Sequence, residues 1–252
     1  MRSGARNFIV EIVVAGIVLA AVVVFVHAMQ APARKEVLVT IPEGSTVYDI
    51  DRILAQAGVI RPGDLAQASS APALEGRLFP DTYYFYASST ADAVVRKMVD
   101  DFDAKAGPLL EADGANAGRD LIVASLVQKE VASSTDQRLV AGIIDKRLAA
   151  GMYLDIDATI CYAKEVAAPA STSGCYPLSA DDLRIDSPYN TYTHTGLPPG
   201  PIGNPGLAAI EAALDPASSS YWYYLSDPKT GATIYAVTLA EQNANRAKYL
   251  GQ

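Results

Sequence analysis

The chain has 252 residues, with 20 Lys and Arg against 28 Asp and Glu, a net charge of −8. An acidic balance without a run of basic residues argues against nucleic acid as a partner, because phosphate binding requires clustered cations. Only two histidines and two cysteines are present, and no glycine-rich phosphate-binding motif occurs. We therefore expect no metal and no cofactor, and carboxylates become the expected catalytic groups if the chain is an enzyme.

The N-terminus contains a long apolar segment, residues 8–29, interrupted by one acid, Glu11. As a helix it would extend about 33 Å, enough to cross a hydrocarbon core of about 30 Å. Two arginines precede it, so the positive-inside rule places residues 1–7 in the cytoplasm and the remainder outside. We expect a retained single-pass anchor in the cytoplasmic (inner) membrane. The alternative is a cleaved signal peptide, since residues 31–33 resemble a cleavage site.

Export from the cytoplasm changes the expected oxidation state of the two cysteines. Cys161 and Cys175 close a loop rich in Ala, Ser, Pro and Gly. Because thiols outside the cytoplasm usually oxidise, we expect a disulfide between them. The alternative is a small buried residue at Cys161 and a loop thiol at Cys175.

After a linker, residues 30–36, the first half of the chain predicts a small α+β subdomain, residues 37–112. Residues 36–41 have the β-branched alternation of a strand, stopped by a Pro-Glu-Gly turn. Apolar residues at helical spacing from Val47 to Gly58 predict a helix. An aromatic strand follows the turn at Pro80-Asp81, and a helix is expected over 90–110.

A polar, glycine-rich stretch, residues 113–119, is the predicted boundary of a second, mixed α+β domain, residues 113–252. The overall fold class is α+β. Its first expected elements are a helix capped by Asp120, a helix from residues 133–135 to Gly151 and a strand over 153–163. A rigid Pro/Gly-rich loop over 187–206 and a helix from Asn204-Pro205 to Leu214 should follow. The last expected elements are a hairpin of residues 221–226 and 232–237 and a closing helix with a Thr238–Glu241 capping box.

Glu130 is the candidate general acid. The residues seven, four and three positions before it are Val123, Leu126 and Val127, so it projects from the apolar stripe of its helix. Aliphatic neighbours remove water from a carboxylate and raise its pKa towards the working pH, as a general acid requires. The alternatives are a glutamate that turns to water at the helix end, or one paired with an arginine.

Other candidates carry weaker signals. On the expected strand, Asp155 and Asp157 lie two residues apart and therefore share one face. One of them would orient a substrate hydroxyl or a water. The alternative is that this face of the strand is simply solvated. Flat aromatic rings suit sugars, although aromatic strands are more often core; these residues are Tyr189, Tyr192, Tyr221, Trp222, Tyr223 and Tyr224. His194 is expected in a surface turn.

Five segments of the chain, in this order, resemble the endolytic murein transglycosylase family, also called YceG-like proteins. They are IPEGSTVYDI, LEGRLFPDTYYF, LIVASLVQKE, KRLAAGMYLDIDATICYA and SPYNTYTHTGLPPGPIGNPG. The resemblance covers residues 37–252. It implies a membrane-anchored protein with an extracytoplasmic catalytic domain, peptidoglycan glycan strands as substrate, and association with a peptidoglycan synthase complex.

The resemblance also implies a reaction and a set of site residues. Nascent strands would be cleaved between N-acetylmuramic acid and N-acetylglucosamine, leaving a 1,6-anhydro end, with Glu130 as acid and then base. No metal or cofactor is implied. Asn190 and Tyr192 are expected to line the sugar cleft, and Asp157 and Glu75 to brace the site. Asp81 is a further supporting residue, and each of these is open to a purely structural role.

The chain departs from the family pattern at three places. Gln128 stands where the family has a second acid, and Ala158 stands where it usually has proline. Only about seven residues separate the apolar segment from Val37, so no LysM-like module is expected there. Two other functions stay open: a catalytically silent glycan-binding scaffold anchored in the membrane, and a hydrolase in which Asp157 activates water and the product has a reducing end.

Overall fold

The computed structural model describes residues 16–17, 19–20, 22, 35–67, 71–169 and 174–251. The predicted anchor and linker lie almost entirely outside these residues. Within the described part of the chain, no helix has the length and apolar character needed to cross a membrane. The anchor and its orientation therefore stay predictions, and the fold below is that of residues 36–252, which form one compact unit.

The unit begins with a two-stranded antiparallel sheet of β1 (Glu36–Thr40) and β2 (Thr82–Tyr86). Both strands were predicted, and their alternation buries Val39, Tyr83 and Phe85 on one face. Three helices complete this region: α2 (Val47–Gln56), α3 (Ala71–Leu74) and α4 (Ala91–Lys105). The hydroxyl of Thr46 caps α2 in a full capping box, which explains why the helix starts where the sequence predicted.

The helix expected over 90–110 is two helices, α4 and α5 (Gly107–Asp113). Pro108 has no N–H to donate, so α4 ends at Lys105, with Ala106 as its C-cap, and a second helix begins at Gly107. A 3₁₀ turn, η1 (Gly114–Asn116), leads into α6 (Ala117–Glu130). Asp120 was expected to cap α6, but it lies within the first turn of that helix instead.

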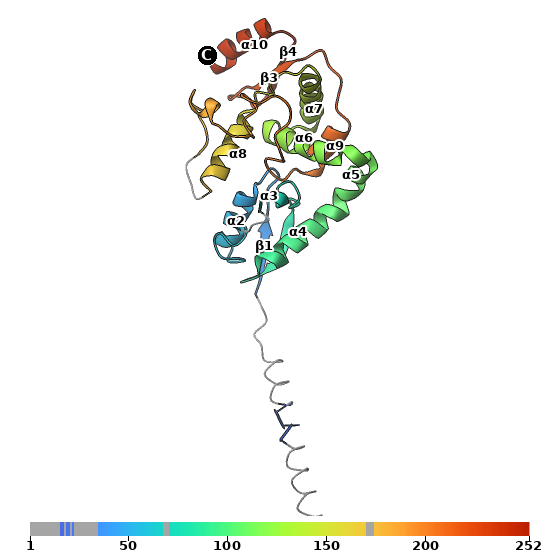
Figure 1. Cartoon of the computed structure of the whole chain (residues 1–252), viewed down its shortest axis with the longest axis vertical. Helices are drawn as coiled ribbons and strands as arrows, with labels where there is room; N and C mark the ends of the chain where they lie inside the picture. Colours follow the sequence, from blue (N-terminus) through green and yellow to red (C-terminus); the bar gives the residue numbers. More distant parts are fainter. Residues whose placement is uncertain are drawn as a thin grey trace, which may run out of the picture. The chain divides into compact units, whose positions relative to one another are not determined.

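Helix α6, labelled in Figure 1, contributes Val123, Leu126 and Val127 to a hydrophobic cluster that also contains residues of α7 (Ser134–Ala149) and α9 (Leu207–Leu214). It packs against both of these helices, and α7 begins and ends where predicted. A Cβ on Gly142 of α7 would lie 2.1 Å from the Ala217 carbonyl oxygen, so only glycine permits this close approach. Helix α9 begins later than expected, at Leu207, with Gly206 as its N-cap.

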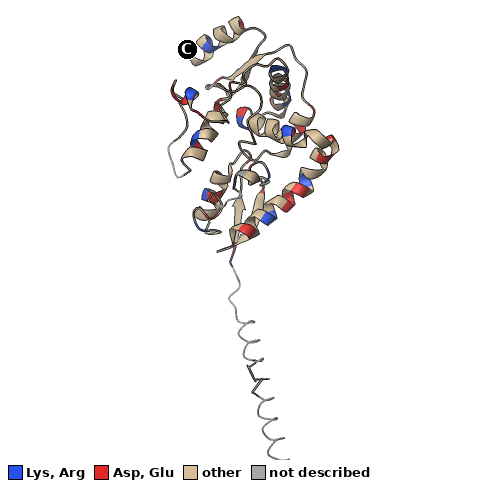
Figure 2. Ribbon diagram, viewed as in Figure 1, with Lys and Arg blue, Asp and Glu red and all other residues tan. Residues whose placement is uncertain are grey.

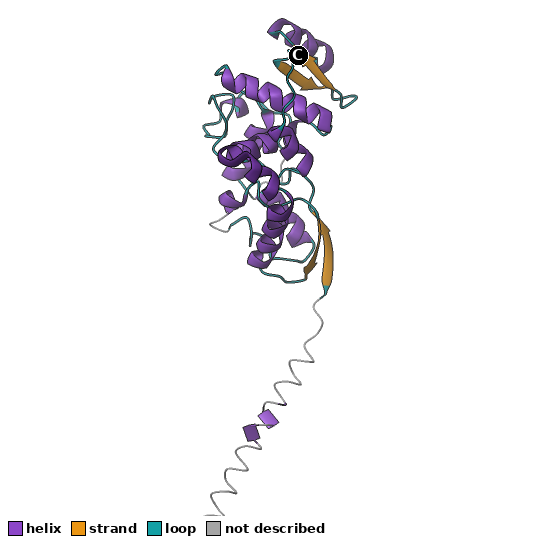
Figure 3. Cartoon of the chain, turned by 90° about the vertical axis from the view of Figure 1, so that its right-hand side faces the viewer, coloured by secondary structure: helices purple, strands orange, loops and turns teal. Residues whose placement is uncertain are grey.

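The predicted C-terminal hairpin is β3 (Tyr223–Ser226) and β4 (Thr233–Ala236), followed by α10 (Leu239–Asn245) with its Thr238 capping box and a π-helical turn, η3 (Arg246–Leu250). The two small sheets lie at opposite ends of the unit, with helices between them (Figures 1 and 3). This arrangement confirms the α+β fold class.

The strand predicted over 153–163 is wrong. Residues Asp157–Ala167 form a helix, α8, preceded by a turn in which Asp155 has a φ of 53°. The β-branched residues Ile156, Thr159 and Ile160 favoured a strand locally, but burial recurs at helical spacing, in Ala158, Thr159, Tyr162 and Ala163. Asp155 and Asp157 therefore do not share a strand face.

The predicted domain boundary near residue 113 lies inside the unit. One hydrophobic cluster spans Val39 to Met98, whereas Phe102, Ala106 and Leu110 already belong to the second cluster with α6. The division into two domains stays a prediction. Both acidic and basic side chains lie along α4 (Figure 2), so the charges on this helix are of mixed sign.

Candidate active site

Glu130 is the last residue of α6, and the chain leaves the helix at Val131 in an extended conformation. Val123, Leu126 and Val127 are buried, as the apolar stripe predicted. The Glu130 side chain is only half-buried, so part of it remains accessible. The Tyr224 hydroxyl donates a hydrogen bond to Glu130 Oε2 at 2.8 Å. The carboxyl group thus emerges from the core with one fixed hydrogen-bond partner.

The surroundings of Glu130 raise its pKa to about 7. Desolvation by the surrounding protein is the largest cause, and the negative charge of Asp157 adds to it. The hydrogen bond from Tyr224 and the positive charge of Arg147 act in the opposite direction. Near neutral pH this carboxyl therefore exists in both protonation states, which suits a group that donates and later accepts a proton.

Arg147 of α7 is a buried cation that organises the site. Its Nε donates to the carbonyl oxygen of Trp222 at 2.9 Å, and its Nη1 donates to that of Leu154 at 2.7 Å. The guanidinium also lies over the Tyr223 ring, 5.0 Å from its centroid. Arg147 thereby joins α7, the turn before α8 and the strand that carries Tyr224.

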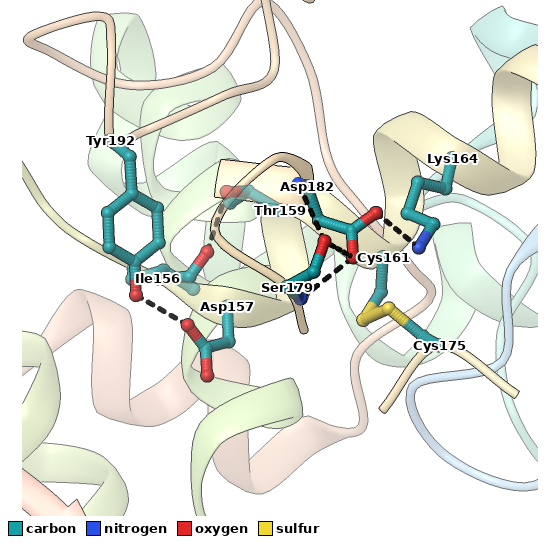
Figure 4. Close-up of a disulfide and its surroundings, with 9 residues drawn as sticks. All are labelled: Ile156, Asp157, Thr159, Cys161, Lys164, Cys175, Ser179, Asp182 and Tyr192. Atoms are coloured by element: carbon teal, nitrogen blue, oxygen red, sulfur yellow. Dashed lines mark hydrogen bonds and ion pairs between the residues drawn. A yellow bond between two sulfur atoms is a disulfide. The ribbon is translucent and has the colours of Figure 1, made fainter. Parts of the chain in front are cut away.

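The segment from Asn190 to Tyr192 is held against the start of α8. The Ile156 N–H donates to Thr191 Oγ1 at 3.0 Å, and the hydroxyls of Thr159 and Thr191 lie 3.0 Å apart. With this segment fixed, the Tyr192 hydroxyl donates to Asp157 Oδ1 (Figure 4). Asp157 and Tyr192 form a hydrogen-bonded pair beside Glu130, on whose pKa Asp157 acts.

Asn190 was expected to line the cleft, but it is fully buried. Its Nδ2 donates to the carbonyl oxygens of Leu183 at 3.2 Å and Ile185 at 2.8 Å, and its Oδ1 accepts from the Tyr192 N–H at 2.9 Å. Its side chain is occupied by the backbone, and it positions Tyr192. No direct contact with a substrate follows from this placement.

Glu75 lies in a separate polar cluster and is 4% exposed. Its Oε2 accepts from the Val47 N–H at 3.2 Å, and its Oε1 accepts from Asn204 Nδ2 at 3.0 Å. Burial raises its pKa to about 8, opposed by the hydrogen bonds from Val47 and Tyr162. Because Tyr162 lies on α8, Glu75 connects the helix of Asp157 with the N-terminal region, as a bracing residue does.

Comparison with known proteins identifies the family of the chain. The YceG-like family model matches residues 20–248. The chain belongs to the YceG-like family. An endolytic murein transglycosylase from Bacillus subtilis is 33% identical over 181 residues, which cover 70% of this chain and 48% of that protein. One from Streptococcus pneumoniae is 33% identical over 183 residues, which cover 70% of this chain and 32% of the relative.

A solved structure supports the same assignment. The crystal structure of a YceG-like protein from Listeria monocytogenes matches with a TM-score of 0.68 and 31% identity, over 82% of this chain and 75% of that chain. This YceG-like chain spans about half the length of the B. subtilis relative and about a third of the S. pneumoniae relative.

Two departures of this YceG-like chain from the family pattern have a structural account. Gln128 Oε1 accepts from the Gly206 N–H at 3.0 Å and so holds the Pro/Gly-rich loop. Ala158 is the second residue of α8, where proline is also tolerated because its N–H would have no partner within the helix.

Of the three remaining candidates, Asp81 and His194 have partners outside this site, whereas Asp155 lies beside Arg147. The Asp81 carboxylate pairs with Lys105, which lowers its pKa. His194 is exposed in its turn, and its Nδ1 lies 3.1 Å from Thr193 Oγ1. Asp155 Oδ2 lies 3.7 Å from Arg147 Nη1.

Two residues of this YceG-like site did not emerge from the sequence. The residues seven, four and three positions before Arg147 are Val140, Ile143 and Ile144, which is the spacing that singled out Glu130. The sequence therefore already indicated that Arg147 projects from the apolar stripe of its helix. Tyr224 was noted only among the aromatic residues, because its partner is 94 positions away. The structure also contains the disulfide between Cys161 and Cys175 that the sequence led us to expect.

Proposed function

We propose that this YceG-like protein is an endolytic lytic transglycosylase that cleaves nascent peptidoglycan strands between N-acetylmuramic acid and N-acetylglucosamine. The observation that carries the proposal is the half-buried Glu130, with its pKa near 7, in a protein whose relatives are named endolytic murein transglycosylases. The protein acts outside the cytoplasm, held by the segment 8–29 near the membrane, where newly made strands are within reach. A peptidoglycan synthase complex is the proposed partner.

In this reaction Glu130 protonates the glycosidic oxygen while the C1–O bond breaks and an oxocarbenium-like sugar forms. The resulting carboxylate then accepts the proton of the muramic acid C6 hydroxyl, whose oxygen bonds to C1 and closes the 1,6-anhydro ring. An intramolecular hydroxyl takes the place of the second carboxylate and the water of ordinary glycosidases. One titratable carboxyl therefore suffices, and a pKa near 7 suits both steps.

The neighbouring residues have distinct roles in this scheme. The Tyr224 hydroxyl fixes the orientation of Glu130, and Arg147 stabilises its anionic form between the two steps. The negative charge of Asp157 favours reprotonation of Glu130 and stabilises the positive charge on the sugar. The hydrogen bond from Tyr192 keeps Asp157 in place.

Mass spectrometry of glycan products tests the proposal. The full chain, as wild type and as Glu130→Gln, is incubated in detergent with uncrosslinked nascent peptidoglycan. We expect anhydro-ended fragments from the wild type and none from the variant. Reducing-ended fragments would instead indicate a hydrolase that uses water. Glycan binding by both proteins without any fragments would favour the scaffold.

A further inference from the structure

The segment that follows the Cys loop is fastened to α8 and its surroundings at three points. The disulfide joins Cys175 to Cys161 of α8, with their Cα atoms 5.5 Å apart (Figure 4). Lys164 Nζ donates to Asp182 Oδ1 at 2.6 Å, and Asp182 is itself bound by Ser179. Asn190 binds the carbonyl oxygens of Leu183 and Ile185. Residues 175–185 therefore form a wall that is held to the middle and the last turn of α8.

Tyr176 is the aromatic side chain on this wall. It follows Cys175 directly and is 62% exposed, so its ring is not part of the hydrophobic core. Cys161 lies one helical turn beyond Asp157 on the same face of α8, and the bridge therefore fixes Cys175, the residue before Tyr176, beside this helix. Partial burial, together with the negative charges of Glu130 and Asp157, raises the pKa of the Tyr176 phenol to about 12. Tyr176 thus lies within the electrostatic reach of both carboxyl groups.

We propose that Tyr176 is a sugar-binding residue beside Glu130, and that the Cys161–Cys175 disulfide holds its ring in position to stack on a pyranose ring of the glycan. This inference rests on the proposed function and names part of its substrate site. Pyranose rings have apolar C–H faces, and a flat ring with a polar tip is suited to cover one of them. The hydroxyl stays protonated near neutral pH and can donate to a sugar oxygen.

The first test measures glycan binding without turnover. The full chain carrying Glu130→Gln is titrated in detergent with peptide-free, uncrosslinked glycan strands. Tyr176→Ala is expected to weaken binding about 5-fold to 10-fold, because the stacking surface is lost. Tyr176→Phe is expected to weaken it less than about 2-fold, since the ring remains. Tyr84 of β2, which is 60% exposed, supplies the matched control: Tyr84→Ala leaves binding unchanged.

The second test asks whether the disulfide acts through Tyr176. Replacing both cysteines, Cys161→Ser with Cys175→Ser, is expected to weaken binding as much as Tyr176→Ala does. In the Tyr176→Ala background the same replacement should cause no further loss, because coupled residues are not additive. Thermal unfolding shows whether the variants are folded at the assay temperature. Independent, additive losses would overturn the role assigned to the bridge.

Turnover separates this proposal from the proposed function. In the wild-type background Tyr176→Ala should raise KM while kcat stays within about 2-fold, since uniform binding is lost and the acid is intact. If the wild type forms anhydro-ended products and Tyr176→Ala binds and cleaves like it, the sugar-binding role alone is overturned. If the wild type forms no such products and the Glu130→Gln chain binds no glycan, the proposed function fails and the subsite fails with it.

Discussion

Two glutamates of this molecule share a raised pKa and differ in almost everything else. Glu130 and Glu75 are both shifted upwards from the ordinary value of a carboxyl group, to about 7 and about 8, and burial is the main cause in each. Glu130 is partly accessible, and among the described residues it accepts one hydrogen bond, from the Tyr224 hydroxyl. Glu75 is enclosed, and both of its oxygens accept hydrogen bonds, from the Val47 N–H and the Asn204 amide.

The difference separates a group that is ready to react from one that holds the fold together. A raised pKa marks only the loss of water around the anion. A general acid must also reach its substrate and keep oxygen lone pairs free for the proton it exchanges. Glu130 meets both conditions, whereas Glu75 is committed to joining the turn before α2 with the Pro/Gly-rich loop.

A matched pair of substitutions, Glu130→Gln and Glu75→Gln, should separate the two roles most clearly. Glu130→Gln should lower kcat by about 10²-fold to 10⁴-fold, because an amide cannot donate and recover the proton. Glu75→Gln should change kcat by less than about 10-fold, since its contribution is positional. Rates of fragment release from uncrosslinked glycan measure both. Equal losses in the two variants would refute the division of roles.

Stability should show the reverse order. Glu75→Ala leaves the buried Val47 N–H and the Asn204 amide without their acceptor, so we expect the free energy of unfolding to fall by about 3 kcal/mol. Glu130→Ala removes one hydrogen bond at a partly accessible position, and its cost should stay within about 1 kcal/mol. Urea unfolding of the two variants at pH 6 makes the comparison. A larger loss from Glu130→Ala would contradict it.

Short-range patterns predicted most of the elements. Alternation, helical spacing and capping residues within a few positions of each other were enough to predict β1, α2, β2, α7, the C-terminal hairpin and the capped α10. Helix α8 was missed because its β-branched residues favour a strand locally, and packing against α6 decided the outcome. Local propensity is a weak guide where tertiary contacts oppose it.

The site was predictable to the extent that its residues lie on apolar stripes. Glu130 was found in that way, and the same spacing identifies Arg147. The partners of Glu130 were not predictable, because Tyr224 comes from a strand 94 residues away. For the same reason Asn190, read from its motif as a cleft residue, proved to be buried against the backbone of residues 183 and 185.

The raised pKa of Glu130 should make the stability of the protein depend on pH. A folded-state pKa raised above the unfolded value means that the native state binds more protons, so the free energy of unfolding falls as pH rises. For Glu130 this loss extends from about pH 4.5 to about pH 7. It amounts to about 2 kcal/mol, after allowing for partial accessibility.

Glu130→Gln keeps an acceptor for the Tyr224 hydroxyl but has no carboxyl group that titrates. The variant should therefore lack the fall in the free energy of unfolding that Glu130 causes, and it should be more stable than the wild type at pH 8. Urea unfolding across pH 4 to 9 measures the slope, and the exposed Glu111→Gln serves as the control with no change expected. A variant with the full wild-type slope would show that Glu130 is solvated in the folded protein.

The smallest expected effects concern the neighbours of Glu130, and their signs are opposite. Activity requires protonated Glu130 and should fall as pH rises through about 7. Tyr224→Phe removes a hydrogen bond that lowers the Glu130 pKa, so this alkaline limb should move to higher pH. Asp157→Asn removes a negative charge that raises it, so the limb should move to lower pH, each by less than about one unit.

Tyr192→Phe is the control for these shifts, because it removes the hydrogen bond to Asp157 while the Asp157 charge remains. Its alkaline limb should shift much less than that of Asp157→Asn, because the charge is kept and only the hydrogen bond that holds Asp157 in place is lost. General loosening of the site would expose Glu130 to water and move the limb of every variant to lower pH. Shifts of opposite sign are expected only if the Glu130 pKa is lowered by the Tyr224 hydrogen bond and raised by the Asp157 charge at the same time. Glu75 differs in that it is enclosed and its oxygens accept hydrogen bonds from fixed donors inside the protein.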